Sequence, residues 1–211
     1  LLRLDSTWPM LRFCVHIGAL ASVMLLYWQR VNHIYNELRL VSLPPRQRKR
    51  PPDTEAILDA RLISIAAIPA LIGAICSAFF FRGGTDLLWL AIFLTGGAVL
   101  VYVPDYVPGG DRKTGAMSPL EGVLLGICAG CSIIPGISRV GLMLALALLR
   151  KCSRSHILDL ILLISGVMLA ENILVDFVSI LVSGFSGFTL LRLIGCLLAA
   201  MASFGGGIGA I

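Results

Sequence analysis

Five apolar blocks, each about as long as a lipid bilayer is thick, constrain this chain more than any other feature. They cover residues 11–28, 62–81, 87–103, 157–180 and 188–211. A helix needs about 20 predominantly apolar residues to cross the hydrocarbon core. Only 14% of the residues are charged, against roughly 25% in a soluble domain. The pattern predicts an all-α polytopic membrane protein with about five transmembrane helices, and it excludes a soluble two-domain enzyme and a disordered chain.

The segment 118–150 differs from these blocks because its middle interrupts any straight helix. It reads SPLEGVLLGICAGCSIIPGISRVGLMLALALLR, with Pro135-Gly136 and Ser138-Arg139 near its centre. Proline removes a backbone donor and glycine weakens a helix. Irregular backbone inside a membrane is tolerated only where it lines a cavity or is buried in protein. We therefore predict a re-entrant hairpin of two half-helices that meet at the PGISR motif.

Residues 29–61 form the one long polar stretch of the chain. Two Pro-Pro pairs forbid a continuous helix through it. Its basic residues are Arg30, Arg39, Arg46, Arg48, Lys49, Arg50 and Arg61. We interpret the stretch as a solvated cytoplasmic loop, although such a run could also bind anionic lipid. The net charge of +5 then reflects orientation in the membrane rather than nucleic-acid binding, and residues 1–211 are expected to form a single integral membrane domain.

The positions of the basic loops support the re-entrant hairpin. If the 29–61 loop is cytoplasmic, a hairpin at 118–150 leaves the basic residues of 104–117 and of 150–156 in the cytoplasm as well. The turns at 82–86 and 181–187 then face outward. A full crossing at 118–150 would instead export the cluster Arg150, Lys151 and Arg154, against the positive-inside rule.

Arg139 is the residue most indicative of a function. An arginine in the bilayer interior costs roughly 2.5–3.5 kcal/mol on insertion scales, so it is rare there without a role. Its planar guanidinium binds phosphate through two parallel hydrogen bonds. Gly136 and Gly141 allow close backbone approach, and Ser138 adds a hydroxyl that is either a donor or a nucleophile. Together they predict an anion site for phosphate; the alternative is an arginine paired with an internal acid for structure alone.

Carboxylates in or beside the apolar segments are candidates to balance Arg139. These are Glu121, Asp159, Glu171 and Asp176. Glu171 is the preferred partner and Asp176 a second choice, whereas Glu121 lies near a hairpin end and could simply face water.

The histidines and cysteines form no ligand pattern. Cys128-x-x-Cys131 has redox or metal spacing, but no second pair or histidine accompanies it. His16 lies inside a span and is expected to be a hydrogen-bonded packing residue. The six cysteines lie mostly within apolar segments, so no disulfide framework is inferred. No metal ligand is assigned.

The PGISRVG motif at 135–141 resembles the Pro-Gly-x-Ser-Arg-Ser-Gly-x-Thr signature of the bacterial undecaprenyl-diphosphate phosphatases, the bacitracin-resistance family. Upstream, EGVLLG at 121–126 resembles the helix that leads into this signature, and Ser153-Arg154 resembles the helix that follows. Near the start, LRFCVHIGALASVMLLYWQRV resembles the first full span of the family, and residues 61–73 resemble the next. The resemblance covers nearly the whole chain.

This resemblance implies a multi-pass enzyme of the bacterial inner membrane. Its members hydrolyse undecaprenyl diphosphate to the monophosphate and phosphate, which recycles the peptidoglycan lipid carrier and confers bacitracin resistance. The implied fold has inverted repeats whose two re-entrant hairpins meet at the active site. Ser138 and Arg139 match the catalytic Ser-Arg motif, and Gly136, Ser138, Arg139 and Gly141 would bind the diphosphate. A divalent metal ion, Mg or Ca, assists catalysis in the family.

The chain also departs from the family pattern. The second serine of the signature is Val140, the threonine is Met143, and a glutamine that often precedes the motif is Ala129. The family's Glu-rich hairpin would precede residue 11 and its last span would follow residue 211. We therefore expect a fragment whose general base and metal ligands lie elsewhere.

Two alternative functions stay open: a polyprenyl-phosphate transporter or flippase, and an inactive relative that only binds lipid phosphate. Membrane lipids are expected partners, nucleic acid is not, and homodimerisation is left open.

Overall fold

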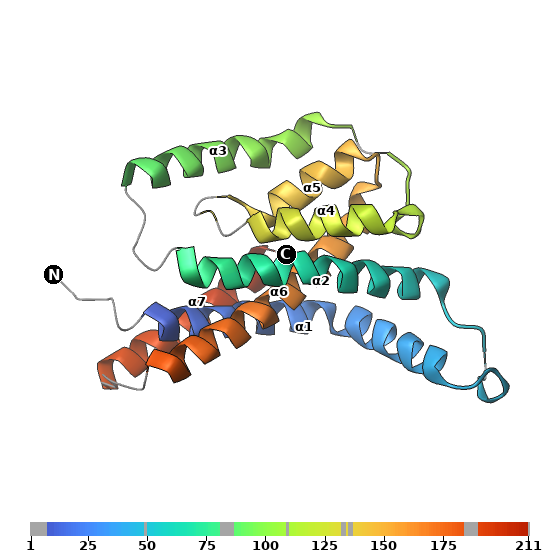
Figure 1. Cartoon of the computed structure of the whole chain (residues 1–211), viewed down its shortest axis with the longest axis horizontal. Helices are drawn as coiled ribbons and strands as arrows, with labels where there is room; N and C mark the ends of the chain where they lie inside the picture. The colour runs from blue at the N-terminus through green and yellow to red at the C-terminus, as the bar shows by residue number, and fades with distance from the viewer. Residues whose placement is uncertain are drawn as a thin grey trace. The chain divides into compact units, whose positions relative to one another are not determined.

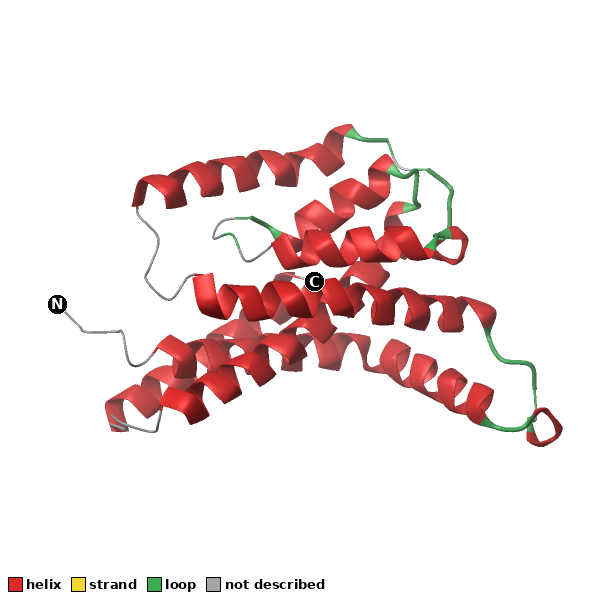
Figure 2. Ribbon diagram, viewed as in Figure 1, coloured by secondary structure: helices red, strands yellow, loops and turns green. Residues whose placement is uncertain are grey.

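The computed structural model describes residues 8–48, 50–80, 87–108, 110–131, 134, 137–183 and 190–210. Throughout these ranges the regular structure is helical, without a β-strand (Figures 1 and 2). The α-helices are α1 (Trp8–Ser42), α2 (Thr54–Phe80), α3 (Leu87–Tyr106), α4 (Pro119–Gly130), α5 (Arg139–Leu149), α6 (Arg154–Ser183) and α7 (Leu190–Ala210). Two 3₁₀ turns, η1 (Pro45–Gln47) and η2 (Thr114–Ala116), lie in the connections. The predicted all-α class is confirmed.

Four of these helices are long and apolar enough to cross a membrane. The qualifying stretches are Met10–Ser42, Thr54–Cys76, Leu88–Tyr106 and Arg154–Val182. They correspond to the first four predicted spans, and α7, with a shorter apolar stretch at Leu193–Gly209, occupies the fifth. The chain is a multi-pass membrane protein.

The 29–61 stretch is mostly helical, so its prediction as one long loop was wrong. α1 continues to Ser42 and α2 begins at Thr54. The Pro-Pro pairs stop both helices where expected, leaving only 43–53 outside α-helix. The polar residues before and after this connection are compatible with helix because they pair with one another across α1 and α2, as described below. Which side of the membrane the connection faces stays a prediction.

The chain divides into two compact units, one made of Leu1–Tyr27 with Gly166–Ile211 and the other of Trp28–Ser165. In the first unit, the start of α1 runs antiparallel to the end of α6, since the Phe13 ring packs at a tilt against Phe177 and Val23 lies against Gly166. α7 runs parallel to α1. Small residues let these two helices approach closely, with Gly18 against the Ala200 backbone.

In the second unit, α4 packs against α2 through a stripe of glycines. Gly122, Gly126 and Gly130 recur every four residues and so lie on one face of α4. A Cβ atom on Gly126 would stand 2.5 Å from the Pro69 ring and 2.8 Å from the Ala66 Cα atom. The two helices therefore touch backbone to backbone. α5 packs on α4, and α3 packs on α5, which gives the order α2, α4, α5, α3 (Figure 1).

α4 and α5 form the helix–turn–helix predicted at 118–150. With 12 and 11 residues, they are about 18 and 16 Å long, against a hydrocarbon core of about 30 Å. Neither can span alone. Their outer ends meet, because Arg112 N–H donates to the Lys151 carbonyl at 3.2 Å and Ser153 N–H donates to the Arg112 carbonyl at 2.9 Å. The chain thus reaches α4 and leaves α5 at the same end, which we call the hairpin base; the opposite end, where α4 ends and α5 begins, is the hairpin tip.

Candidate functional site

Ser138 and Arg139 lie at the hairpin tip, where α5 begins. Ser138 is the N-cap: its hydroxyl oxygen accepts a hydrogen bond from the Gly141 N–H at 3.2 Å. Its carbonyl accepts the Leu142 N–H at 3.0 Å, the first helical bond. Arg139 is the first residue of the helix, and both side chains are half-buried. The positive end of the α5 dipole therefore lies at the residue that carries the guanidinium, and a helix N-terminus of this kind favours an anion.

The two glycines of the predicted anion site differ in what can be said of them. Gly136 lies outside the described residues. Gly141 is buried, and a Cβ atom there would lie 3.0 Å from Val101 Cγ2 and 3.2 Å from Ser138 Oγ. Gly141 thus lets α3 and the serine cap approach the start of α5. Its N–H is bonded to Ser138, and its role as a phosphate ligand stays a prediction.

Two of the acids proposed to balance Arg139 have other cations. Asp176 pairs with Arg12 and His16, and Glu121 pairs with Arg112. Asp159 lies in α6 in the same unit as Arg139, and Glu171 lies in the other unit. The pairing of Glu171 with Arg139 stays a prediction. His16 is hydrogen-bonded to Asp176, and this part of the expectation is confirmed.

Glu121 anchors the hairpin base and does not face water. It is 4% exposed, and Arg112 grips its two oxygens through Nη1 at 2.7 Å and Nη2 at 2.9 Å. Ser118 N–H donates to the same carboxylate at 2.7 Å, and Ser118 Oγ accepts from Glu121 N–H, which completes a capping box at the start of α4. The hydrogen bonds from Arg112 hold the pKa of Glu121 below its ordinary value.

Asp59 in α2 joins three segments of the second unit. It is 2% exposed and accepts from Arg30 of α1 at 2.7 Å and from the Thr114 hydroxyl of η2 at 3.0 Å. Glu55 lies one turn before Asp59 in α2, and its carboxylate is 3.2 Å from the ammonium group of Lys113. These contacts fix the connection that leads into the hairpin against α1 and α2.

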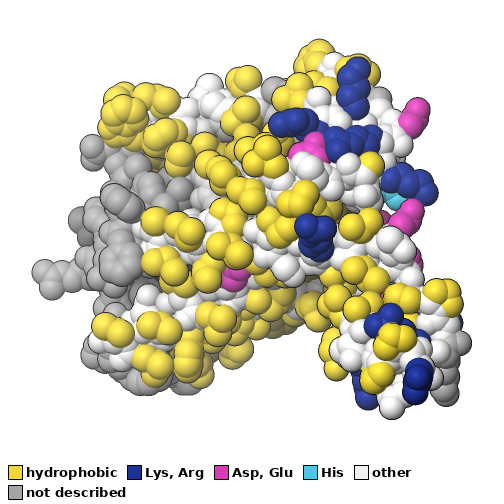
Figure 3. Space-filling model, turned by 45° about the vertical axis from the view of Figure 1, so that its right-hand side comes forward, with side chains coloured by type: hydrophobic (Ala, Val, Ile, Leu, Met, Phe, Trp, Pro, Cys, Tyr) yellow, Lys and Arg dark blue, Asp and Glu magenta, His cyan; other side chains and the backbone are white. Residues whose placement is uncertain are grey.

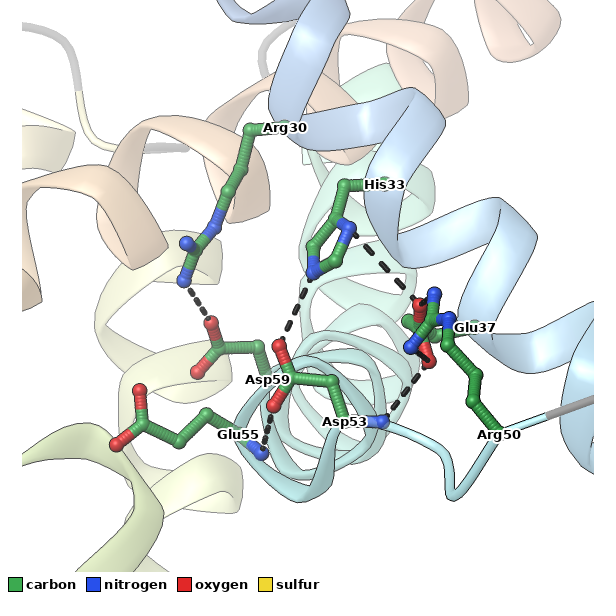
Figure 4. A network of polar contacts seen from close by, with 7 residues as sticks. All are labelled: Arg30, His33, Glu37, Arg50, Asp53, Glu55 and Asp59. Carbon is green, nitrogen blue, oxygen red and sulfur yellow. Dashed lines mark hydrogen bonds and ion pairs between the residues drawn. The ribbon is translucent and has the colours of Figure 1, made fainter.

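A polar network closes the 43–53 connection (Figure 4). Arg50 binds Glu37, which also accepts the Asp53 N–H at 2.8 Å. His33 lies 3.0 Å from Asp53, whose other oxygen caps α2 by accepting the Glu55 N–H at 3.0 Å. The hydrogen bond from His33 lowers the pKa of Asp53. Figure 3 shows Lys and Arg side chains gathered at this end of the unit.

Sequence reasoning missed this network because it treated 29–61 as one loop. A signal was present: Arg30, His33 and Glu37 follow the i, i+3, i+7 spacing of one helical face, and Glu55 and Asp59 follow i, i+4. Opposite charges on two such faces predict paired helices rather than a solvated loop.

The described part of the chain offers no donor set for the implied Mg or Ca ion. Within the ranges given above, no three His, Cys, Asp or Glu side chains gather into a group that could hold a metal. The acids at the hairpin base already have cations as partners. We therefore assign no step of the reaction to a metal ion.

Comparison with known proteins matches this architecture. The family profile described as "Bacitracin resistance protein BacA" matches residues 1–210. The chain belongs to the BacA family. It is 27% identical over 154 residues to an undecaprenyl-diphosphatase of Methanosphaera stadtmanae, an alignment that covers 67% of this chain and 54% of the relative. It is 29% identical over 198 residues to an undecaprenyl-diphosphatase of Alkaliphilus metalliredigens, covering 92% of this chain and 71% of the relative. The alignments thus span about half to three quarters of these BacA relatives.

Proposed function

We propose that this BacA-family chain is part of an undecaprenyl-diphosphatase of the bacterial inner membrane, with the hairpin tip as its phosphate-binding part. The family membership and the two relatives support the reaction class. The observation that carries the proposal is the hairpin itself. A serine N-cap and an arginine lie at the start of α5, about 16 Å from the hairpin base. With the base at the membrane surface, this distance corresponds to roughly half of the hydrocarbon core.

The chemistry that the tip can provide is electrostatic. The Arg139 guanidinium clamps the diphosphate and offsets the charge that develops on the transferred phosphoryl group. The Ser138 oxygen accepts the Gly141 N–H, so its own O–H remains able to donate to a phosphate oxygen. This favours Ser138 as a hydrogen-bond donor. The general base is not assigned to this chain.

The proposal is tested with Arg139→Lys in the whole protein. Lysine keeps the positive charge but loses the planar fork that grips phosphate oxygens in pairs. We expect phosphate release from undecaprenyl diphosphate in detergent, with divalent metal and a chelator control, to fall on the order of 10²–10³-fold. Insertion and folding should be unchanged. The matched control is Arg150→Lys, an exposed arginine at the other end of the same helix, which should retain activity.

Near-normal turnover by Arg139→Lys would show that the arginine is a structural counter-charge. If the unaltered protein releases no phosphate but moves a polyprenyl phosphate across vesicles, the transporter alternative holds. A broken helix suits either function, so the assay and not the fold separates them.

A further inference from the structure

A second polar cluster lies in the first unit, where α1 and α6 run antiparallel. Asp176 of α6 is buried, with a side chain 3% exposed. Its Oδ1 accepts from Arg12 Nη2 at 2.5 Å, and its Oδ2 lies 2.9 Å from His16 Nδ1. Ionisable groups inside transmembrane segments are costly and usually functional, and the hairpin mechanism uses none of these three.

The acid of the cluster is buried, whereas its two donor side chains are partly exposed. The Arg12 side chain is 41% exposed and that of His16 24%. If the only role of Arg12 and His16 were to balance the charge of Asp176, all three side chains could be buried. Because a carboxylate only accepts, the Asp176 contact places the proton of the neutral imidazole on Nδ1. His16 Nε2 then has no partner among the residues that the structure describes. One buried acid therefore orients two partly exposed basic side chains.

The guanidinium of Arg12 has N–H donors that Asp176 does not use. Only Nη2 is engaged by Asp176, and the shielded Nε has no acceptor in the described ranges. A guanidinium has five N–H donors and binds phosphate oxygens in pairs. Both oxygens of Asp176 are already occupied, so this acid is poorly placed to hold a metal ion.

The cluster lies within about two turns of the ends of α1 and α6. Arg12 and His16 lie four and eight residues after Trp8, the start of α1, or about 6 and 12 Å along the helix axis. Asp176 lies seven residues before Ser183, the end of α6. The apolar stretch of α1 begins at Met10, so the two donors stand in its first two turns, where lipid phosphates meet the hydrocarbon region.

We propose that Arg12 and His16, oriented by Asp176, form a binding site in the first unit for a phosphate group of the monoester class. Arg12 binds two phosphate oxygens. His16 Nε2 donates to a third when the ring is protonated, or accepts the P–OH proton of a monoanion when it is neutral. The headgroup of a lipid phosphomonoester and free inorganic phosphate share this chemistry.

Lipid binding measured by native mass spectrometry tests the site without using catalysis. The whole protein carrying Arg139→Gln is the background, so that the hairpin tip does not contribute, and phosphatidic acid and phosphatidylcholine are the probes. We expect phosphatidic acid to bind at least tenfold more tightly than phosphatidylcholine. Arg12→Gln should weaken phosphatidic acid binding about ten- to hundredfold, because it removes charged hydrogen bonds. His16→Gln should weaken it less.

Two further variants separate the site from folding and from general charge. The double variant Arg12→Gln/Asp176→Asn removes both members of the ion pair, so no uncompensated acid stays buried. Its binding of phosphatidic acid should be as weak as that of Arg12→Gln alone. Arg46→Gln removes an exposed arginine of η1 and should bind normally. Tight binding by the double variant, or equal losses in Arg46→Gln and Arg12→Gln, would overturn the proposal.

Inorganic phosphate then distinguishes the two sources of the ligand. Displacement of phosphatidic acid by inorganic phosphate supports a site for the phosphate group alone. Failure to displace it supports a lipid site in which the acyl chains contribute. A protein without phosphatase activity would leave all these binding results unchanged, so the two proposals fail separately.

Discussion

The base of the α4–α5 hairpin is held by ion pairs between segments, whereas the described part of the tip is organised by a helix cap. At the base, Glu121 is held by Arg112, and Asp59 by Arg30. At the tip, Ser138 caps α5, whose first residue is Arg139. The two ends of one short hairpin are therefore organised by different kinds of contact.

This difference separates the end that supports the hairpin from the end that carries the proposed binding site. At the base, ion pairs and backbone bonds between the segments before α4 and after α5 fix where the hairpin starts and ends. At the tip, a serine cap and the first turn of α5 direct donors toward the turn. A site held on rigid elements is more precise than one on a free loop, so the saturated base serves the tip by holding it still.

Sidedness is the largest expected effect, because its outcome is all-or-none. In a cysteine-free background, Lys113→Cys and Ser155→Cys place thiols on exposed residues beside the two ends of the hairpin base. A membrane-impermeant maleimide should label both from the same side, which we expect to be the cytoplasmic one. Labelling from opposite sides would mean that 118–150 crosses the membrane, and the comparison of base and tip would lose its meaning.

Gly126→Ala tests the packing that carries the hairpin. The added Cβ would meet the Ala66 backbone and the Pro69 ring, at 2.5 Å from Pro69 Cγ, so α4 must move off α2. We expect a loss of about 2–3 kcal/mol or more in the free energy of unfolding in detergent. The control, Gly96→Ala in α3, places its Cβ in open space and should change stability by less than about 1 kcal/mol. Similar losses in both would refute the backbone contact.

Glu121→Gln tests the base. It keeps the shape but leaves Arg112 without its charged partner, and we expect a loss of about 1–3 kcal/mol in the free energy of unfolding. The partial exposure of Arg112, 33% of its side chain, keeps the effect below that of a fully buried pair. Phosphate binding at the tip should fall only through the loosened base, whereas a tip variant should lose binding with the fold intact.

The same pair predicts an acid-sensitive component of stability. Because the pKa of folded Glu121 is below its ordinary value of 4.5, the unfolded chain binds the proton first as pH falls. The stabilisation is therefore complete well above pH 4.5 and is lost as pH falls through the lower, folded pKa. Unfolding measured between pH 7 and pH 3 should show this loss in the unaltered protein. The loss of stability at low pH should be smaller in Glu121→Gln. The same pH profile in the variant and in the unaltered protein would contradict this prediction.

Much of the fold was predictable because bilayer thickness and helix breakers act locally. Block length identified the spans, and the Pro-Gly and Ser-Arg pairs located the break between α4 and α5. The limits of α1 and α2 were not predicted, because polar residues such as His33 and Asp59 look solvated until their partners on another helix are known. The expectation that Glu121 could face water was wrong for the same reason. Its partner Arg112 lies in a loop, and the two meet only because the capping box turns the chain there.

The residues of the proposed site can be named from the sequence, but their arrangement cannot. Ser138 and Arg139 follow from the cost of an intramembrane arginine beside a helix start. That Ser138 is the N-cap, with its oxygen on Gly141 N–H, depends on where α5 begins. The cluster of Arg12, His16 and Asp176 joins residues 160 or more positions apart, a distance over which helical periodicity carries no information.

The smallest expected effect, at Ser138, distinguishes a cap from a reacting group. Ser138→Ala removes the cap and should lower the free energy of unfolding by about 1 kcal/mol, while Ser138→Asn keeps a capping oxygen and should restore most of it. Both variants lose the hydroxyl. If Ser138 donates to phosphate, both should release phosphate more slowly but measurably, and Asn should not rescue the rate. Complete loss of turnover in the stable Ser138→Asn protein would indicate a nucleophile, whereas normal turnover there would reduce the role of Ser138 to that of a helix cap.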